Sequence, residues 1–311
     1  MRLGVIVNQS AARRPASIDQ LIEQVASIAR DGFPAAVFAH TSGVDALTVI
    51  ALAGHVVPDI QLATGVVPIY TRHPVLMAQQ ALTTQAAIGG RLTLGIGLSH
   101  KPVVENAWGL SFARPVDYMR EYLAVLQPLL KSEPVAFAGR RIIAQTQLSM
   151  PDAAPPSVVL AALGQRMLRL AGEQADGTAT WMVGPKTLQS HITPTLTTAA
   201  REAGRASPRI IVGLPICVTS DAAAAWARAD RAFGRYGQLP SYRAMLDREG
   251  VASPADVALI GSESDVEDQL AAIERAGGTE LSASVFGSAE EHVRTFEFLK
   301  AQVAHVRSTP V

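Results

Sequence analysis

Short apolar runs alternate with longer amphipathic segments along almost the whole chain. The runs are rich in Val, Ile, Leu and Ala, whereas the segments between them repeat apolar residues at helical spacing. We therefore predict eight strands, each followed by a helix. These strands cover residues 3–7, 35–39, 60–66, 92–98, 157–162, 178–183, 209–218 and 281–286.

A parallel sheet needs a covering helix between consecutive strands, and this alternation supplies one each time. Eight such units predict a (β/α)8 TIM barrel, an α/β fold. A doubly wound sheet is the alternative, because it gives the same alternation with fewer strands. We find no linker or repeat, so we expect a single domain over residues 1–311. Two segments, near 132–156 and 236–257, look irregular, and we expect insertions that shape a pocket.

Composition narrows the function classes. The chain has 311 residues, 48% hydrophobic and 17% charged, with a formal net charge of zero and no basic block. This argues against nucleic acid as a partner. No apolar run reaches the roughly 18 residues that span a bilayer, and the first residues are too weakly apolar for a secretion signal. We expect a cytoplasmic protein with a small-molecule substrate and no membrane partner.

In a barrel, chemistry takes place at the carboxyl ends of the strands. His40 and His100 each follow a predicted strand directly, a position that suits a proton donor near neutral pH. The alternative for each is an ordinary hydrogen-bonded loop histidine. We expect the histidines on predicted helices to lie at the surface. They are His55, His191, His292 and His305.

The sequence lacks the motifs of several common catalytic and cofactor sites. No His-x-His pair ends the first strand, which stops at Asn8, so we expect no metal. No Gly-x-Ser-x-Gly elbow occurs, which leaves acyl transfer unsupported. Gly95 and Gly97 lie inside a strand and lack the third glycine of a dinucleotide fingerprint. Glycine inside a strand indicates a bulge or close backbone approach, which suits a flat ring across the strand ends.

The junction at Gly164 to Arg166 is the better candidate for binding phosphate. A small residue before a helix exposes amide groups at the positive end of that helix, and the arginine adds charge. The alternative is that Gly164 serves only a tight turn. Trp181, at the end of the next strand, is more often a core residue than a stacking one.

Taken together and in order, several segments resemble the luciferase-like oxidoreductases. This is the bacterial-luciferase superfamily of (β/α)8 enzymes that use flavin or deazaflavin. The pattern is most similar to actinobacterial members that use coenzyme F420, the 5-deazaflavin. The matching segments are TGV at 64–66, RHPVLMAQQALTTQAAIGGRLTLGIG at 72–97, Glu105, REYLAVLQPLL at 120–130, LAALG and RMLRLAGEQADG within 160–177, YRAMLDREG at 242–250, and IGSESDVEDQLAAIERAGGTEL at 260–281.

The resemblance implies roles for individual residues. In deazaflavin members a bulge carries a non-proline cis peptide bond that supports the ring, and the matching bond here is Gly65-Val66. His40 matches the histidine beside the reactive carbon, whereas Ser99 and His100 stand where some relatives have Glu or Gly. The implied proton donors are His40, His100 and Glu105. The implied cofactor-binding residues are Asn8, His40, Thr64, Gly65, Val66, Gly97, Ser99, Leu163, Gly164, Gln165, Arg166, Met182, Val183 and Gly184.

The implied function is hydride transfer between F420 and a small organic substrate, most simply reduction of a C=C or C=N bond. Alcohol oxidation is the reverse direction. The alternative within the superfamily is an FMN-dependent monooxygenase, and a third possibility is a relative that binds cofactor without catalysis. Relatives often form homodimers, and the small-residue face at 77–87 could serve that purpose. A core-facing stripe is the commoner reason for such a face.

Overall fold

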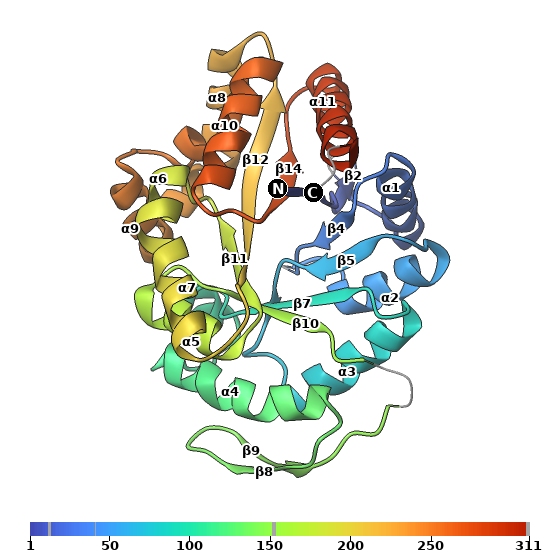
Figure 1. Cartoon of the computed structure of the whole chain (residues 1–311), viewed down its shortest axis with the longest axis vertical. Coiled ribbons are helices and arrows are strands. Elements are labelled where there is room, and N and C mark those ends of the chain that lie inside the picture. The colour runs from blue at the N-terminus through green and yellow to red at the C-terminus, as the bar shows by residue number, and fades with distance from the viewer. Residues whose placement is uncertain (12–13, 41, 151–153, 309–311) are drawn as a thin grey trace.

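The computed structural model describes residues 1–11, 14–40, 42–150 and 154–308. Eight parallel strands close into a barrel, because β7 pairs with both β5 and β10. Helices surround the strands (Figure 1). The predicted (β/α)8 barrel is confirmed. Its strands are β1 (Arg2–Ile6), β4 (Ala35–Phe38), β5 (Gln61–Thr64), β7 (Leu92–Gly97), β10 (Ser157–Ala161), β11 (Gly177–Trp181), β12 (Arg209–Val218) and β14 (Glu280–Val285).

The outer helices alternate with the strands as the hydrophobic pattern predicts. Ser17 begins the first of them with a capping box, in which its hydroxyl accepts the Gln20 N–H. The main outer helices are α1 (Ile18–Arg30), α2 (Ala46–Val56), α3 (Pro74–Ala87), α4 (Pro115–Leu130), α5 (Gln165–Gln174), α7 (Thr193–Glu202), α8 (Ala222–Phe233), α10 (Glu263–Arg275) and α11 (Ala289–Ser308). None of the helices in the described residues has the length and apolar content needed to cross a bilayer.

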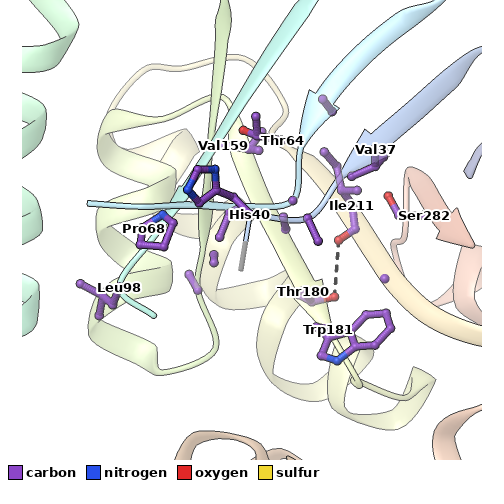
Figure 2. A pocket seen from close by; sticks show the side chains of 18 of the residues that line it. Val37, His40, Thr64, Pro68, Leu98, Val159, Thr180, Trp181, Ile211 and Ser282 are labelled. Atoms are coloured by element: carbon purple, nitrogen blue, oxygen red, sulfur yellow. Dashed lines mark hydrogen bonds between the residues drawn. The ribbon is translucent and has the colours of Figure 1, made fainter. Parts of the chain in front are cut away.

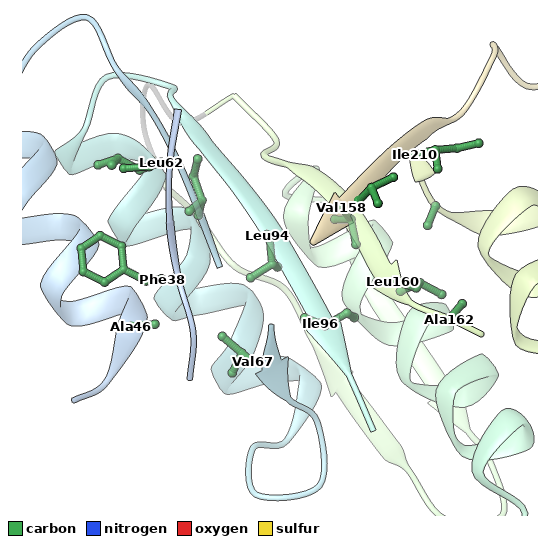
Figure 3. Close-up of a cluster of buried hydrophobic side chains, with 14 of the residues drawn as sticks. Phe38, Ala46, Leu62, Val67, Leu94, Ile96, Val158, Leu160, Ala162 and Ile210 are labelled. Atoms are coloured by element: carbon green, nitrogen blue, oxygen red, sulfur yellow. The ribbon is translucent and has the colours of Figure 1, made fainter. Parts of the chain in front are cut away.

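The main core lies between the barrel wall and the helices. Leu62, Leu94, Ile96, Val158 and Leu160 project from neighbouring strands into one apolar layer (Figure 3). Each of these side chains is at most 1% exposed. Burial of this kind contributes about 1.5–3 kcal/mol for each large aliphatic side chain. The outer layer therefore holds the barrel in shape and leaves the inner face of the strands free for other uses.

The small-residue face of α3 belongs to this core. Met77, Ala78, Ala81 and Leu82 are fully buried. The buried side of this face is therefore a core stripe, the commoner of the two explanations, and the homodimer stays a prediction.

A bulge interrupts the pairing between the third and fourth barrel strands. Before it, Ala63 stands opposite Thr93; after it, Val67 of β6 (Val67–Pro68) stands opposite Ile96. Residues 64–66 therefore face only residues 94–95, so that one extra residue leaves the ladder.

The Thr64 side chain bridges this bulge. Its hydroxyl donates to the Gly95 carbonyl at 2.7 Å and accepts the Gly95 N–H at 2.9 Å. A Cβ on Gly95 would overlap the Thr64 carbonyl oxygen, so only glycine fits there. Gly95 and Gly97 indicated that another group comes close to this strand. That group is the bulge at residues 64–66.

An ion pair crosses the opposite, amino end of the barrel. Arg209 of β12 donates to the Glu280 carboxylate of β14 at 2.6 and 2.9 Å. The same guanidinium also donates to the hydroxyls of Thr93 and Ser157 at 3.1 and 3.0 Å. One side chain thus ties four strands together at the floor of the barrel.

The segment 132–156 is the first of the two expected insertions. It contains a hairpin, β8 (Val135–Ala138) and β9 (Ile143–Thr146), which lies beside α4 (Figure 1). Glu121 of α4 holds its turn by accepting the backbone N–H groups of Arg140, Arg141 and Ile142 at 3.1, 2.8 and 3.0 Å. Of the described part of 132–156, only Pro155 lines the central cavity. The hairpin itself stays outside the cavity lining, because a long-range carboxylate contact attaches it to α4, so the described part of this segment contributes to the pocket through Pro155.

The segment 236–257 is helical where irregular structure was expected. It comprises most of a 3-10 turn, η3 (Gly234–Gln238), the helix α9 (Pro240–Glu249) and a second turn, η4 (Pro254–Val257). Few of its residues are buried, so the helical period is weak in the sequence. A short strand, β13 (Leu259–Gly261), pairs with β12 and was also missed.

The hydroxyl bridge at the bulge yields a stability prediction. Thr64→Val keeps the shape but leaves the buried Gly95 amide and carbonyl without this partner, so the free energy of unfolding should fall by about 1–3 kcal/mol. Urea unfolding measures this loss. Thr64→Ser keeps the hydroxyl and should preserve slow hydrogen exchange at the Gly95 N–H, which Thr64→Val should accelerate. Equal exchange in both variants would contradict the bridge.

Candidate active site

A cavity of about 1760 Å³ runs along the barrel axis and is lined by residues of all eight barrel strands. It extends from Arg209 and Glu280 near the floor to His40 and His100 at the carboxyl ends. Small residues on the inner face of the strands make the space possible, among them Gly4, Ala63, Ala179 and Ser282. The volume exceeds the roughly 300–1,000 Å³ of common ligand pockets. Two ligands, such as a cofactor and a substrate, could therefore occupy it together.

The bulge forms part of the cavity wall. Gly65 and Val66 both line the cavity, and the peptide bond between them is cis, which confirms that prediction. The Gly65 N–H donates to the Phe38 carbonyl at 2.8 Å, which ties the bulge to β4. Beyond Phe38, β4 leads within two residues to His40. The bulge and His40 therefore reach the cavity from adjacent strands, and Figure 2 shows His40 on the opposite side of the pocket from Trp181.

His40 is held as a neutral imidazole. Its Nδ1 accepts the Ala46 N–H at 3.2 Å, a bond that the doubly protonated ring could not make. Nε2 lies 3.3 Å from Nη1 of Arg72. Burial and then the charge of Arg72 lower the pKa of His40 below its ordinary 6.5, although Asp45 opposes the shift.

Arg72 and Asp45 form an ion pair behind His40. Asp45 accepts the Thr48 N–H at 2.9 Å and the Gln80 side-chain amide at 3.0 Å. Burial alone would raise the pKa of Asp45, but the Thr48 hydrogen bonds and the Arg72 charge outweigh it and lower that pKa. Sequence reasoning missed both members of the pair. The only signal was that Arg72 falls inside one of the segments that carry the family resemblance.

His100 enters the cavity after a tight change of chain direction. Ser99 adopts a left-handed conformation with φ of 61°, and both residues line the cavity. The His100 ring lies 5.7 Å from the Tyr242 ring, measured between centroids. Burial and then the charge of Arg235 lower the pKa of His100. Like His40, it is mainly neutral at neutral pH and must take up a proton before it can donate one.

The start of α5 presents free amide groups to the cavity. Gly164 is the N-cap and provides no side-chain hydrogen bond, and a Cβ there would meet nothing within 4 Å. Leu163, Gly164, Gln165 and Arg166 all line the cavity. Arg166 is exposed and lies 3.3 Å from Asp117. Such a helix start attracts anions, as predicted from the sequence.

His191 supports this loop from behind. Its Nε2 lies 2.8 Å from the Leu163 carbonyl oxygen, and the residue is only 8% exposed. The expectation that His191 lies at the surface was wrong. The turn of π-helix at Leu188–Ile192 carries it inward, and the helical pattern of the sequence does not show this.

Six of the predicted site residues lie outside the cavity lining, and three of them are scattered along the chain. Asn8 follows β1, and its backbone N–H and carbonyl are hydrogen-bonded to the Gln24 amide. Gly97 is covered by Val66 and Ala161, which a Cβ would meet at 2.7 and 3.0 Å. Glu105 is exposed and lies 3.9 Å from Lys101. Their predicted roles stay predictions.

The second stretch predicted to hold phosphate is also buried away from the cavity. Met182, Val183 and Gly184 do not line it. The Glu249 carboxylate instead accepts the N–H groups of Lys186 and Thr187 at 3.1 and 2.8 Å, where the next helix starts. A negative charge already fills this helix start, so the 163–166 junction is the better placed of the two.

The arrangement suits a flat ring that carries a phosphate. The exposed bulge offers a backbone surface, a neutral histidine lies next to it, and an uncapped helix start lies on the same cavity. Among the described residues, no group of three or more His, Cys, Asp or Glu side chains is arranged to hold a metal ion.

Comparison with known proteins agrees with this geometry. A family model described as luciferase-like monooxygenase matches residues 1–297. A Mycobacterium tuberculosis protein, Rv3520c, provisionally named a coenzyme F420-dependent oxidoreductase, is 27% identical over 302 residues, which cover 92% of this chain and 84% of that protein.

Two solved structures share the fold. Coenzyme F420 dependent tetrahydromethanopterin reductase from Methanopyrus kandleri aligns with a TM-score of 0.76 and 19% identity, covering 98% of this chain and 99% of that chain. The oxygenating constituent of 3,6-diketocamphane monooxygenase from Pseudomonas putida, in complex with FMN, aligns with a TM-score of 0.76 and 20% identity, covering 98% of both.

The contact between Arg72 and His40 yields a prediction. Arg72→Met removes the positive charge beside Nε2 and leaves Asp45 unpaired nearby, and both changes favour the imidazolium. The pKa of His40 should therefore rise, which an NMR titration of its Cε1–H signal measures. His73→Gln, on the neighbouring exposed residue, should leave this pKa unchanged. An unaltered His40 pKa in Arg72→Met would show that burial alone sets it.

Proposed function

The chain belongs to the luciferase-like monooxygenase family, and we propose that it is a coenzyme F420-dependent oxidoreductase that reduces a C=C or C=N bond of a small organic substrate. The observation that carries this proposal is the meeting of three features on one cavity. They are the bulge at Gly65, the neutral His40 and the uncapped start of α5. The F420 assignment of the Mycobacterium tuberculosis relative supports the choice of cofactor.

The residues present fit such a cofactor. Gly65 and Val66 would lie against the ring, because their backbone is the exposed part of the cavity wall beside His40. The amides at Gly164 to Arg166 would hold the phosphate. Bound F420 would supply a hydride, since a reduced deazaflavin acts as a two-electron donor. Leu98, Trp108 and Phe112 line the same cavity and would keep water away from the reacting atoms.

His40 would provide the proton that completes the reduction. Its ring is neutral at pH 7, so the ring must first take up a proton from solvent, and the imidazolium can then pass a proton to the substrate. The lowered pKa makes the protonated ring a stronger acid than free imidazole, although a less populated one. Alcohol oxidation would use the same residue in reverse, with the neutral ring as the base.

Titration of the purified apoprotein with F420 and with FMN tests the proposal. We expect tight F420 binding and weak FMN binding. The FMN-dependent monooxygenase alternative predicts the opposite, and tight FMN binding without measurable F420 binding would overturn the proposal. A non-catalytic relative would bind F420 but leave it unoxidised in a screen of C=C and C=N compounds.

The uncapped helix start gives a prediction of opposite effects on stability and binding. Gly164→Asp adds a capping carboxylate in open space, which should raise the free energy of unfolding by a few tenths of a kcal/mol. The same charge should weaken binding of the phosphate-bearing cofactor by about tenfold or more. Gly164→Asn caps the helix without adding charge. It therefore separates charge repulsion of the phosphate from simple filling of its place by the new side chain. Unchanged cofactor affinity in Gly164→Asp would show that the cofactor phosphate does not bind at this helix start.

The proton role of His40 gives a prediction for rates. His40→Gln should slow single-turnover oxidation of reduced F420 by about 10²–10⁴-fold, the usual contribution of a positioned acid. In the wild type this rate should rise as pH falls from 8 and level off below a midpoint under 6.5, because the protonated fraction grows. His55→Gln, on an exposed helix end, is the control. A midpoint above 6.5, or the same profile in His40→Gln, would exclude His40 as donor.

A further inference from the structure

One side of the cavity is formed by four rings in tilted or edge-on contact, which we call the aromatic wall: His100, Tyr242, Tyr236 and Trp181. The rings follow one another with centroid distances of 5.7, 5.2 and 6.1 Å. All four residues line the cavity. They come from the loop after β7, from α9, from η3 and from β11, so the wall joins the ends of two barrel strands to the helical segment. It offers a continuous surface for a planar ring.

Arg235 stands at the edge of this wall. It lines the cavity, and its guanidinium lies 5.6 Å from the centroid of the Tyr236 ring. A guanidinium over an aromatic face keeps its N–H edge free for a ligand. Among the ion pairs of the described residues none includes Arg235, whereas Arg166 at the same cavity is close to Asp117. The cation is therefore uncompensated at the mouth.

The acidic side chains nearby do not balance this charge. Among the described lining residues, Glu280 is the one carboxylate, and it is paired with Arg209 at the far end of the barrel. Arg235 also acts on His100, where its positive charge opposes protonation. The mouth beside the aromatic wall thus favours a negatively charged ligand group.

The cofactor phosphate is already provided for elsewhere. The uncapped start of α5 and Arg166 offer backbone amides and a positive charge on a different element of the cavity. Arg235 belongs to η3, which follows α8 and faces the wall instead. The two positive sites suit two different anions.

We infer that Arg235 and the aromatic wall form the substrate subsite of the proposed oxidoreductase, and that its substrate is a planar aromatic compound bearing a carboxylate. The wall would pack against the ring, and the planar guanidinium would donate two parallel hydrogen bonds to the carboxylate. This inference rests on the proposed function for its reaction. Its binding test does not need turnover.

The test measures dissociation constants by calorimetry, with the protein loaded with the cofactor that the titration identifies. The probes are 2-naphthoate and its primary amide, which share a ring and differ in charge. The wild type should bind the acid about tenfold or more tightly than the amide, the size expected of a charge-assisted bidentate pair. Arg235→Gln should abolish that preference without changing the affinity for the amide. Arg235→Lys keeps the positive charge but loses the two parallel N–H donors, so it should retain part of the preference for the acid.

A matched control and a second pair of probes complete the design. Arg231→Gln changes an exposed arginine four residues earlier that is not in the cavity lining, and it should leave both constants unchanged. Benzoate should bind several-fold more tightly than cyclohexanecarboxylate if the wall recognises a flat ring.

Three results would overturn the inference. They are equal binding of acid and amide by the wild type, no preference for the flat ring, and a loss of cofactor affinity in Arg235→Gln. The last would assign this cation to the cofactor. Failure to bind F420 would refute the proposed cofactor while leaving the acid-over-amide comparison interpretable.

Discussion

The site depends on the one-residue shift of register between β5 and β7. Without it, residues 64–66 would continue the ladder, and their backbone would be used up in hydrogen bonds to β7. With it, Gly65 and Val66 face the cavity, while the Thr64 hydroxyl satisfies the Gly95 groups that the bulge leaves without a backbone partner. The cost of an interrupted sheet is thereby kept small, and the exposed backbone is placed beside His40.

Charge is distributed along the same cavity in a consistent way. At the floor, Arg209 is neutralised by Glu280. Near the carboxyl ends, Arg72 is paired with Asp45 but still disfavours protonation of His40. Arg235 forms no ion pair among the described residues. The uncompensated charge of Arg235 therefore favours entry and retention of anionic ligands at the mouth.

The sequence was sufficient for features that are local or periodic. The barrel follows from the alternation of strands and helices, and the glycine start of α5 follows from Gly164 just before an amphipathic segment. The cis bond at Gly65-Val66 came from family resemblance alone. Features that needed contacts between distant residues were missed: Arg72 reaching Asp45, Glu121 attaching the hairpin, Glu249 filling the start of α6 (Pro185–Thr187), and His191 turning inward. Side chains that meet across such separations leave no periodic signal.

The two ends of the candidate site are built on different kinds of support. The bulge and His40 rest on barrel strands whose outer faces are packed in the core, so their geometry is fixed by the fold. The aromatic wall and Arg235 are largely carried by η3 and α9, which contain few buried residues. A change in residues 234–242 would alter the mouth without disturbing the sheet. This division lets cofactor chemistry stay constant while substrate choice varies, and it explains why the substrate end is the part of the site that sequence patterns describe least well.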